Sequence, residues 1–439
     1  MNARRADQGA VAVPRDTVRG DGNEGNNNAC IAVSRDRERT DTGDHVSRRS
    51  GRAGRTSGAP MMGAAQDAPQ AAETPSARTG VSDTEPPLRV LFDIQHPAQV
   101  HLFKHAIWEL QRLGHQTMVA SREKELTTDL LDAHDIEHVS LSTRRPGLPR
   151  LLGELLVREV RMTALARRFR PDVVVSRFSP AAAHAARLSG GKTLLINDTY
   201  LSPPLFQRLI HGVTLPFVDR IYTPPGFDLG LDPERHRTLD FQELSYLHPD
   251  YFHPDRSVLE AHGVDPDRPY AVVRLAAWDA YHDVGHGGMS RETVDEVLSL
   301  LSERGPVYVS SEAPLPAELD AHPIPVPPHL IHHLLYYASV YVGDSGTMAT
   351  EAAVLGTPAV RITTRAGPDD ENVFHELEDR YGLLFSFADE RAALEKLQTL
   401  LSGPSDREHW RSRRDRLVAD QPDVTATLVE QIVSLGRET

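Results

Sequence analysis

From residue 88 onward, short apolar runs alternate with stretches of helical spacing, and this alternation limits the fold more than any other feature. Leu88–Ile94 is typical of a buried strand. Apolar residues at helical spacing follow over Val100–Leu113, and Gly114 is placed to end that helix. Strands that alternate with helices require right-handed crossovers and a mostly parallel sheet. The sequence therefore predicts an α/β fold.

The alternation forms two series, separated by a proline-rich stretch around Tyr246–Asp255. In the first series the pattern predicts further strands at Gln116–Ala120, Asp172–Ser176, Thr193–Ile196 and Arg220–Thr223, and helices at Lys124–Ala133 and Pro180–Leu188. In the second it predicts strands at Tyr270–Leu275, Val307–Ser310, Val340–Val342 and Ala359–Ile362, and helices at Arg291–Glu303, His329–Ala338, Thr347–Leu355 and Arg391–Leu401. We expect two doubly wound, Rossmann-like domains that face a cleft, with ligands beyond the carboxyl ends of the strands.

These series give the predicted domain boundaries. The first domain covers residues 88–250 and the second 251–420; a helix within 421–439 could pack back on the first domain. Residues 1–87 contain 12 basic and 12 acidic residues and few aromatic or β-branched clusters, so we predict a disordered tail. Because Met61 and Met62 lie inside it, translation of residues 1–60 is left open.

Composition excludes several classes of protein. Asp and Glu number 62 against 48 Lys and Arg, a net charge of −14, which argues against a nucleic-acid partner. The single cysteine, Cys30, rules out an internal disulfide and a thiolate metal cage. No apolar run is long enough for a membrane span or a signal peptide, so we expect a cytoplasmic protein with at most transient membrane contact. Acid excess with few lysines suits a halophilic archaeon, although a GC-rich genome would also replace Lys by Arg.

The segment from Val342 to Pro358 is the most informative. It reads Val-Gly-Asp-Ser-Gly-Thr-Met-Ala-Thr-Glu-Ala-Ala-Val-Leu-Gly-Thr-Pro, in which a strand ends, a glycine turn follows and a helix begins. Free N–H groups at a helix start suit a diphosphate, and a carboxylate one turn deeper could accept ribose hydroxyls. The alternative is an acidic turn that only caps the helix. The candidate ligand groups are Gly343, Ser345, Gly346, Thr347 and Glu351.

This segment resembles the donor-binding stretch of two-domain glycosyltransferases of the GT-B fold and of non-hydrolysing UDP-N-acetylglucosamine 2-epimerases. The resemblance implies that the glycine turn holds a diphosphate and that Glu351 binds a ribose. The region from Leu88 to about Leu401 also resembles the prokaryotic family named domain of unknown function 354. The motifs that carry this likeness are Phe92-Asp-Ile-x-His-Pro-Ala98, Arg274-x3-Trp-Asp-Ala-x-His-Asp-x-Gly285 and Gly343-Asp-Ser-Gly-Thr-Met-Ala-Thr-Glu-Ala352. It implies the GT-B fold and leaves the reaction open.

The loop after the first strand opens a helix, where a general base would face an acceptor hydroxyl. Several GT-B transferases have a histidine at a set distance before the glycine that ends this helix. The corresponding position, counted back from Gly114, is Gln99. The base is then either shifted to His96 or His101, with His101 preferred as nearer the helix start, or absent. The structural alternatives are a turn residue for His96 and a first-turn helix residue for His101.

A second loop, after the strand that ends near Arg274, has unusual residue types within ten positions. Arg274 or His282 could neutralise a leaving diphosphate, and Trp278 could stack on a base or sugar ring. Asp279 or Asp283 could hold a sugar hydroxyl or act as a base. Alternatively, the loop is structural, with Arg274 paired to an aspartate and Trp278 packed between the domains.

Smaller signals complete the predicted site. Glu371 and Asn372 follow the strand Ala359–Ile362, where the fold usually contacts the transferred sugar; a helix cap is the alternative. No Asp-x-Asp follows a strand, so we expect no obligatory metal and no cofactor besides the substrate. The segment Gly190-Gly191-Lys192-Thr193 lacks the spacing of a phosphate-binding loop, which excludes an ATPase of that class.

The leading hypothesis is a metal-independent GT-B glycosyltransferase. It would transfer a sugar from a nucleoside-diphosphate donor, with a UDP-sugar expected first, to a glycan or lipid-linked acceptor. One alternative is an enzyme like the UDP-N-acetylglucosamine 2-epimerases, although Gly346-Thr347 and Thr350-Glu351 replace the glycine pair and adjacent glutamates of that pattern. Another alternative is a non-catalytic protein that binds sugar nucleotides.

Overall fold

The structure, a computed structural model, describes residues 86–123, 125–143, 148–198, 204–275, 288–311, 322–368, 370–403 and 407–438, without the side chains of 125, 148–152 and 204. The predicted tail, apart from residues 86 and 87, lies outside these ranges.

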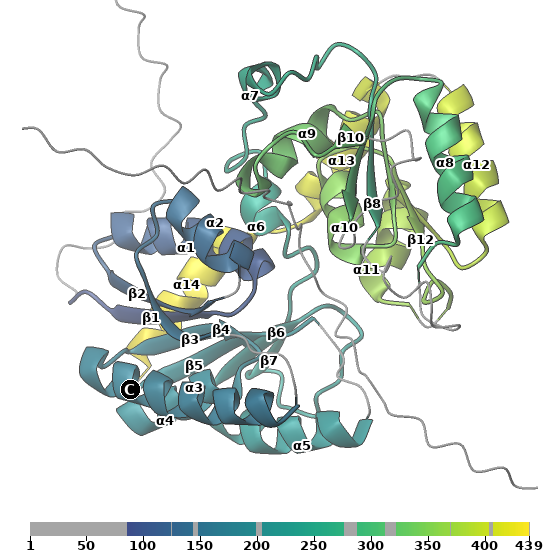
Figure 1. Cartoon of the computed structure of the whole chain (residues 1–439). Helices are drawn as coiled ribbons and strands as arrows, with labels where there is room; N and C mark the ends of the chain where they lie inside the picture. Colours follow the sequence, from purple (N-terminus) through teal and green to yellow (C-terminus); the bar gives the residue numbers. More distant parts are fainter. Residues whose placement is uncertain are drawn as a thin grey trace, which may run out of the picture.

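The first domain is built on a seven-stranded parallel sheet with the order β3-β2-β1-β4-β5-β6-β7. Its strands are β1 (Arg89–Ile94), β2 (Gln116–Glu123), β3 (His138–Thr143), β4 (Val173–Arg177), β5 (Lys192–Ile196), β6 (Arg220–Thr223) and β7 (His236–Thr238). Its helices are α1 (Pro97–Arg112), α2 (Glu125–Ala133), α3 (Leu148–Phe169), α4 (Pro180–Ser189) and α5 (Pro204–Thr214), followed by the short helix η1 (Leu215–Phe217). Figure 1 shows α3, α4 and α5 on the face of this sheet that is turned away from the second domain, with α1 and α2 on the opposite face.

The second domain has a six-stranded parallel sheet with the order β10-β9-β8-β11-β12-β13. Its strands are β8 (Ala271–Leu275), β9 (Val307–Ser311), β10 (His322–Pro323), β11 (Val340–Gly343), β12 (Ala359–Ile362) and β13 (Leu384–Phe387). Helices cover both faces: α8 (Arg291–Ser302), η3 (Pro328–Leu330), α9 (Ile331–Tyr337), α10 (Gly346–Val354), α11 (Asn372–His375), the π-helix η4 (Glu376–Tyr381), α12 (Glu390–Ser402) and α13 (Arg407–Asp420). Two short helices lie between the sheets in the sequence, α6 (Leu244–Leu247) and α7 (Arg256–Ala261).

The central strands are apolar along their whole length because both of their faces are covered. Val90–Ile94 of β1 is buried at every position, as is Ala271–Leu275 of β8. Near-continuous apolar runs are typical of parallel strands between two helix layers. One hydrophobic cluster extends from β1 through α1 and α6 to α9 and α10, so the domains share a continuous core.

The helix α14 (Val424–Arg437) follows the second domain in the chain but packs against α1, β4 and β5 of the first (Figure 1). Arg220 of β6 donates hydrogen bonds to Gln431 (2.7 Å) and Glu438 (2.8 Å). A Cβ atom at Gly436 would lie 2.9 Å from Cδ1 of Leu88, so the helix backbone is in close contact with the start of β1. The chain therefore passes between the two domains more than once.

The α/β class with two Rossmann-like domains is confirmed, and each predicted strand and helix has a counterpart, two of them with identical bounds (β6 and β12). The sequence patterns did not predict the strands β3, β7, β10 and β13, the helices α3, α5, α6, α7, α11 and α13, or the short helices η1 and η4. Within the described ranges, no helix combines the length and apolarity needed to cross a bilayer.

Candidate functional site

Two buried arginines flank the glycine turn of the second sheet. In the parallel register, Gly343 of β11 lies beside Arg274 of β8 on one side and Arg361 of β12 on the other. Only 1% of Arg274 and 4% of Arg361 is exposed. Residues in register on neighbouring strands project to the same face, so two guanidinium groups lie on one face beside the turn.

The partners of the two arginines differ. Arg274 donates from Nη1 to the Ser310 hydroxyl at 2.7 Å. Arg361 donates from Nη1 to Oδ2 of Asp370 at 2.6 Å, and its guanidinium lies 3.6 Å from the centre of the Phe374 ring. Asp370 therefore offsets the charge of Arg361.

The turn leads directly into α10. Ser345 is the N-cap of this helix and its hydroxyl accepts from the backbone N–H of Met348. A Cβ at Gly346 would lie 3.0 Å from the Phe374 ring, so glycine permits this packing. The amides of Gly346 and Thr347 belong to the first helical turn and have no carbonyl of their own helix to bond, which leaves them free to bind an anion.

Glu351, one turn further along α10, is buried and holds the domains together. Its Oε1 accepts a hydrogen bond from the Tyr246 hydroxyl at 2.8 Å and lies 3.1 Å from Nε2 of His332. Tyr246 belongs to α6 and His332 to α9. A ribose contact by Glu351 would therefore use Oε2 or exchange one of these donors.

His101 lies inside the contact between the domains. Its ring centre is 4.9 Å from that of His332, 5.4 Å from that of Tyr246 and 6.0 Å from that of His134. Burial, and then the fields of His332 and Lys104, hold the pKa of His101 well below its usual value. His101 is therefore neutral at physiological pH.

His96 occupies a different position, as the N-cap of α1. Its Nδ1 accepts from the backbone N–H of Ala98 at 3.3 Å. Because Nδ1 is the acceptor, a neutral His96 carries its proton on Nε2. The two predicted histidines thus lie in different environments, one half-buried at the carboxyl end of β1 and one in the core.

The structure adds one acidic residue that the sequence patterns did not indicate. Glu243 lies immediately before α6, and burial raises its pKa to about 7. Within this shift the neighbouring charges of Glu351 and Glu371 also raise the pKa, while Arg177 lowers it. Arg177 ends β4, so groups from the carboxyl edges of both sheets act on the Glu243 carboxyl.

Lys104 of α1 is a second ionisable residue that the sequence patterns did not indicate. Burial lowers its pKa to about 8, opposed by the charge of Glu351. The structure thus adds a carboxyl group and an ammonium group with shifted pKa values to the residues near the domain contact. No local motif marks either residue, since their surroundings come from segments distant in the sequence.

The remaining predicted residues are placed as follows. Glu371 is the N-cap residue of α11, and burial raises its pKa; its carboxylate lies 3.5 Å from Arg365. Asn372 begins α11 and is exposed. Trp278, Asp279 and His282 lie outside the described residues.

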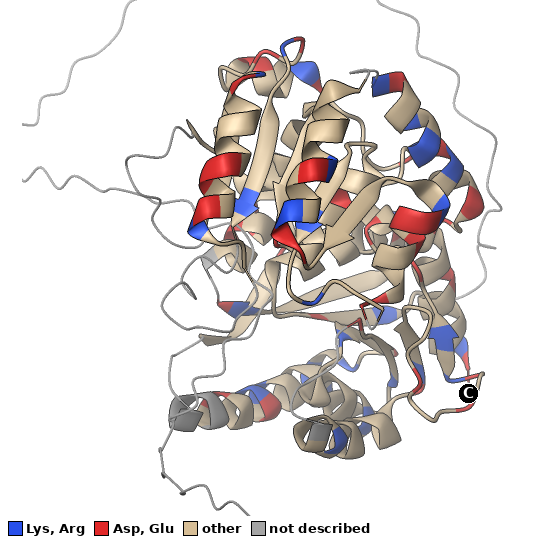
Figure 2. Ribbon diagram, turned by 90° about the vertical axis from the view of Figure 1, so that its right-hand side faces the viewer, with Lys and Arg blue, Asp and Glu red and all other residues tan. Residues whose placement is uncertain are grey.

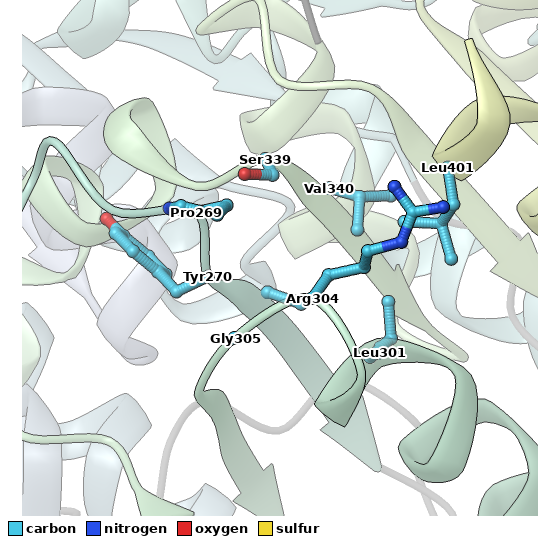
Figure 3. Close-up of a pocket in the computed structure, with 9 residues that line it drawn as sticks. Pro269, Tyr270, Leu301, Arg304, Gly305, Ser339, Val340 and Leu401 are labelled. Carbon is cyan, nitrogen blue, oxygen red and sulfur yellow. The ribbon is translucent and has the colours of Figure 1, made fainter.

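A small cavity marks the opposite edge of the second sheet. Figure 3 shows it between the amino ends of β8 and β11, lined by Tyr270, Arg304 and Val340 among others. Its volume of about 10 Å³ is enough for at most one water molecule. It is separate from the candidate site. Among the described residues, no group of three or more His, Cys, Asp or Glu is placed to hold a metal ion.

Several solved structures share this architecture. The UDP-GlcNAc 2-epimerase from Neisseria meningitidis, determined bound to UDP-GlcNAc, matches with a TM-score of 0.56 and 14% identity over 79% of this chain and 99% of its own. A glycosyltransferase from Rickettsia africae matches with a TM-score of 0.55 and 13% identity over 80% and 100%. The spinosyn forosaminyltransferase matches with a TM-score of 0.54 and 15% identity over 80% and 100%. At such identities the likeness shows the fold, which is the GT-B arrangement of two domains.

A search of curated proteins found no match. The profile of one family, described as protein of unknown function (DUF354), matches residues 88–366. This range includes the glycine turn, Arg274, Glu243 and Glu351. The chain therefore belongs to the DUF354 family.

Proposed function

We propose that this protein is a glycosyltransferase that takes a sugar from a nucleoside-diphosphate donor. The observation that carries the proposal is the glycine turn that starts at Gly343 and leads into α10. In the sheet register, Gly343 is flanked by Arg274 and Arg361. A helix start and the guanidinium of Arg274 at the end of a strand together favour a diphosphate, whereas Asp370 offsets the charge of Arg361. The fold shared with glycosyltransferases supports this choice.

On the donor side, the amides of Gly346 and Thr347 bind the diphosphate. The hydroxyls of Ser345 and Thr347 add donors, and the buried charge of Arg274 favours the negative charge that develops on the leaving group. Glu351 binds the ribose, while Glu371 and Asn372 contact the sugar. These protein groups meet the charge without a metal ion.

On the acceptor side, a base must take a proton from the attacking hydroxyl as the bond to the anomeric carbon forms. Glu243, with a pKa of about 7, is half ionised at neutral pH and suits this role. His96, at the carboxyl end of β1, is the second candidate. The acceptor is a glycan or glycolipid, and the reaction takes place in the cytoplasm.

One observation favours a sugar-nucleotide 2-epimerase as the second candidate. The charges of Glu351 and Glu371 both raise the pKa of Glu243, so three carboxyl groups lie near one another, and an epimerase needs an acid and a base on opposite sides of a sugar. The shared fold includes epimerases as well. A non-catalytic sugar-nucleotide-binding protein is the third reading.

The first experiment measures thermal stabilisation by UDP-, GDP-, dTDP-, CDP- and ADP-sugars in high and low salt. Wild type is compared with Glu351→Gln, which removes the charge but keeps an acceptor oxygen, and with Glu395→Gln on the exposed face of α12 as the matched control. We expect one donor class to stabilise wild type and the control, but not Glu351→Gln. If no nucleotide sugar stabilises the folded protein, the proposal is wrong.

The selected donor is then incubated in deuterated water. A transferase releases the nucleoside diphosphate and leaves the sugar C2 hydrogen in place. An epimerase exchanges that hydrogen for deuterium and releases no diphosphate. Binding without either change, in the presence of candidate acceptors, indicates the non-catalytic protein.

A further inference from the structure

The large apolar side chains that the described residues expose gather on one side of the first domain. Apart from Val139 on β3, all of them lie on α3, α4, α5 or η1, beneath the first sheet in Figure 1. They are Leu155, Leu156, Val157, Val160, Leu188, Leu205, Phe206, Leu209, Val213 and Phe217. Scattered apolar side chains are ordinary on a protein surface, but a gathered set marks an interaction surface.

On α5 these side chains form a stripe. Leu205, Leu209 and Val213 are four residues apart, so they lie on one face of the helix, and they are 77%, 61% and 42% exposed. A surface helix ordinarily turns such a stripe toward the core. Here the described chain leaves it open.

On α3, Leu156 and Val160 form a matching pair, 70% and 69% exposed. Val160 also lines a shallow hollow of about 350 Å³ between α3 and the end of α4, together with Arg167 and Leu188. This hollow gives the surface a place for an apolar group.

His184 of α4 joins the two stripes into one surface. Its Nδ1 lies 2.7 Å from Oε1 of Glu159 on α3, and its Nε2 lies 2.7 Å from the carbonyl oxygen of Val213 on α5. The ring also contacts Phe217 edge-on at 5.0 Å. We call the exposed side of α3, α4, α5 and η1 the apolar face.

The charge of this region is opposite to that of the whole protein. Together α3, α4 and α5 contain seven arginines and two glutamates, with no lysine or aspartate, in a chain of net charge −14. Glu154 is buried and paired with Arg122, so Glu159 is the acidic side chain of these helices that reaches the surface. The exposed arginines among the described side chains of these helices are Arg161, Arg167, Arg168, Arg187 and Arg208. In Figure 2 the helices below the first sheet are mainly tan with blue bands and few red ones.

We propose that the apolar face docks on an anionic phospholipid bilayer. Amphipathic helices with arginine-flanked apolar stripes lie in the plane of the headgroups, with apolar side chains in the acyl boundary and cationic ones at the phosphates. The binding is peripheral and reversible. This inference rests on the first domain alone and does not depend on the sugar-nucleotide activity.

The positive charge of the apolar face favours an anionic bilayer over two other occupants, a second copy of the chain and the N-terminal segment. A second copy of the chain would bring two arginine-rich faces together, and like charges across an interface oppose association. The N-terminal 85 residues carry 12 acidic and 12 basic residues and few large apolar ones, so they offer neither net negative charge nor apolar area. An anionic lipid surface supplies both.

The test is co-sedimentation with vesicles of phosphatidylglycerol and phosphatidylcholine, compared with phosphatidylcholine alone. We expect binding to the anionic vesicles that weakens as salt rises. Leu205→Ser with Leu209→Ser should reduce the partition coefficient at least about tenfold, because two apolar side chains no longer enter the lipid. Arg208→Glu should reduce binding, whereas Arg391→Glu on α12 of the second domain, the matched control, should leave it unchanged. Thermal unfolding verifies that each variant is folded.

Three outcomes would overturn the proposal. They are absence of vesicle binding by the folded wild type, equal binding to neutral and anionic vesicles, or unchanged binding by the leucine variant. Light scattering in the absence of lipid identifies the alternative occupant. If the wild type self-associates and the leucine variant does not, while neither binds vesicles, the face is an interface between copies.

Discussion

The Tyr246 hydroxyl donates a hydrogen bond of 2.8 Å to Oε1 of Glu351, which joins the segment between the domains to α10. Tyr246→Phe removes this donor from a buried carboxylate. We expect the free energy of unfolding in urea to fall by about 1.5–3 kcal/mol, as for a hydrogen bond to a charged group. Tyr336→Phe is the control, because it removes a hydroxyl that bonds no described residue. Equal losses in both variants would contradict the prediction.

The buried pair Arg361–Asp370 gives a second prediction. Both side chains are at least nine-tenths buried. Arg361→Met leaves an unpaired carboxylate in the interior, so we expect a loss of about 3–5 kcal/mol in unfolding free energy. Adding Asp370→Leu should recover most of it. Arg391→Met, which breaks an exposed pair with Glu395, should change stability by less than about 1 kcal/mol. A double variant no more stable than the single one would contradict this account.

The raised pKa of Glu243 predicts how turnover depends on pH, measured with the donor that the stabilisation screen selects. A base acts when deprotonated, so kcat/KM should rise with pH through about 7, the raised pKa of this carboxyl. Glu243→Gln should remove that limb and lower kcat/KM by about 10²–10⁴-fold. Glu260→Gln, on an exposed position of α7, should keep both the limb and the rate. If kcat/KM of Glu243→Gln still rises with pH through about 7, another group is responsible for the rise.

The histidines near the domain contact predict sensitivity to acid. Burial lowers the pKa of His105 to about 4 and of His134 to about 3. The unfolded chain protonates these histidines more readily than the folded protein does. The contribution of the neutral histidines to the free energy of unfolding is therefore complete above about pH 6.5 and is lost as pH falls toward 4 and 3. Each adds up to about 1.4 kcal/mol per pH unit to the slope of unfolding free energy. His105→Gln and His134→Gln should flatten this slope, while His409→Gln on the surface of α13 should not.

The sequence predicted those parts of the fold that are buried on both sides. Strands β6 and β12 and helix α10 follow from apolar runs with clear ends. Helix α3 was missed because it has apolar side chains on its outer side as well as its inner side, which obscures the helical period. Helix α13 was missed for the opposite reason, since it is charged around most of its circumference and buries Leu417 alone.

For the candidate site, the positions of the glycine turn and Glu351 were predictable because strand, turn and helix are consecutive in the chain. The donor-binding roles of Gly343, Ser345, Gly346, Thr347 and Glu351 stay predictions. Glu243, Lys104 and the two donors to Glu351 were not, because their burial depends on how the domains pack. The predicted roles of His96, His101, Arg274, Glu371 and Asn372 stay predictions. Those of Trp278, Asp279 and His282 fall on residues outside the described ranges.

The return of α14 to the first domain has a consequence for synthesis. The ribosome makes β1 long before the helix that covers Leu88, and the whole second domain emerges between them. Domains usually complete folding in the order in which they emerge. Here the first domain cannot complete its core until the second domain and α14 have been synthesised. Its apolar surface between β1 and β4 is exposed until then, so this surface is a natural binding site for a chaperone during translation.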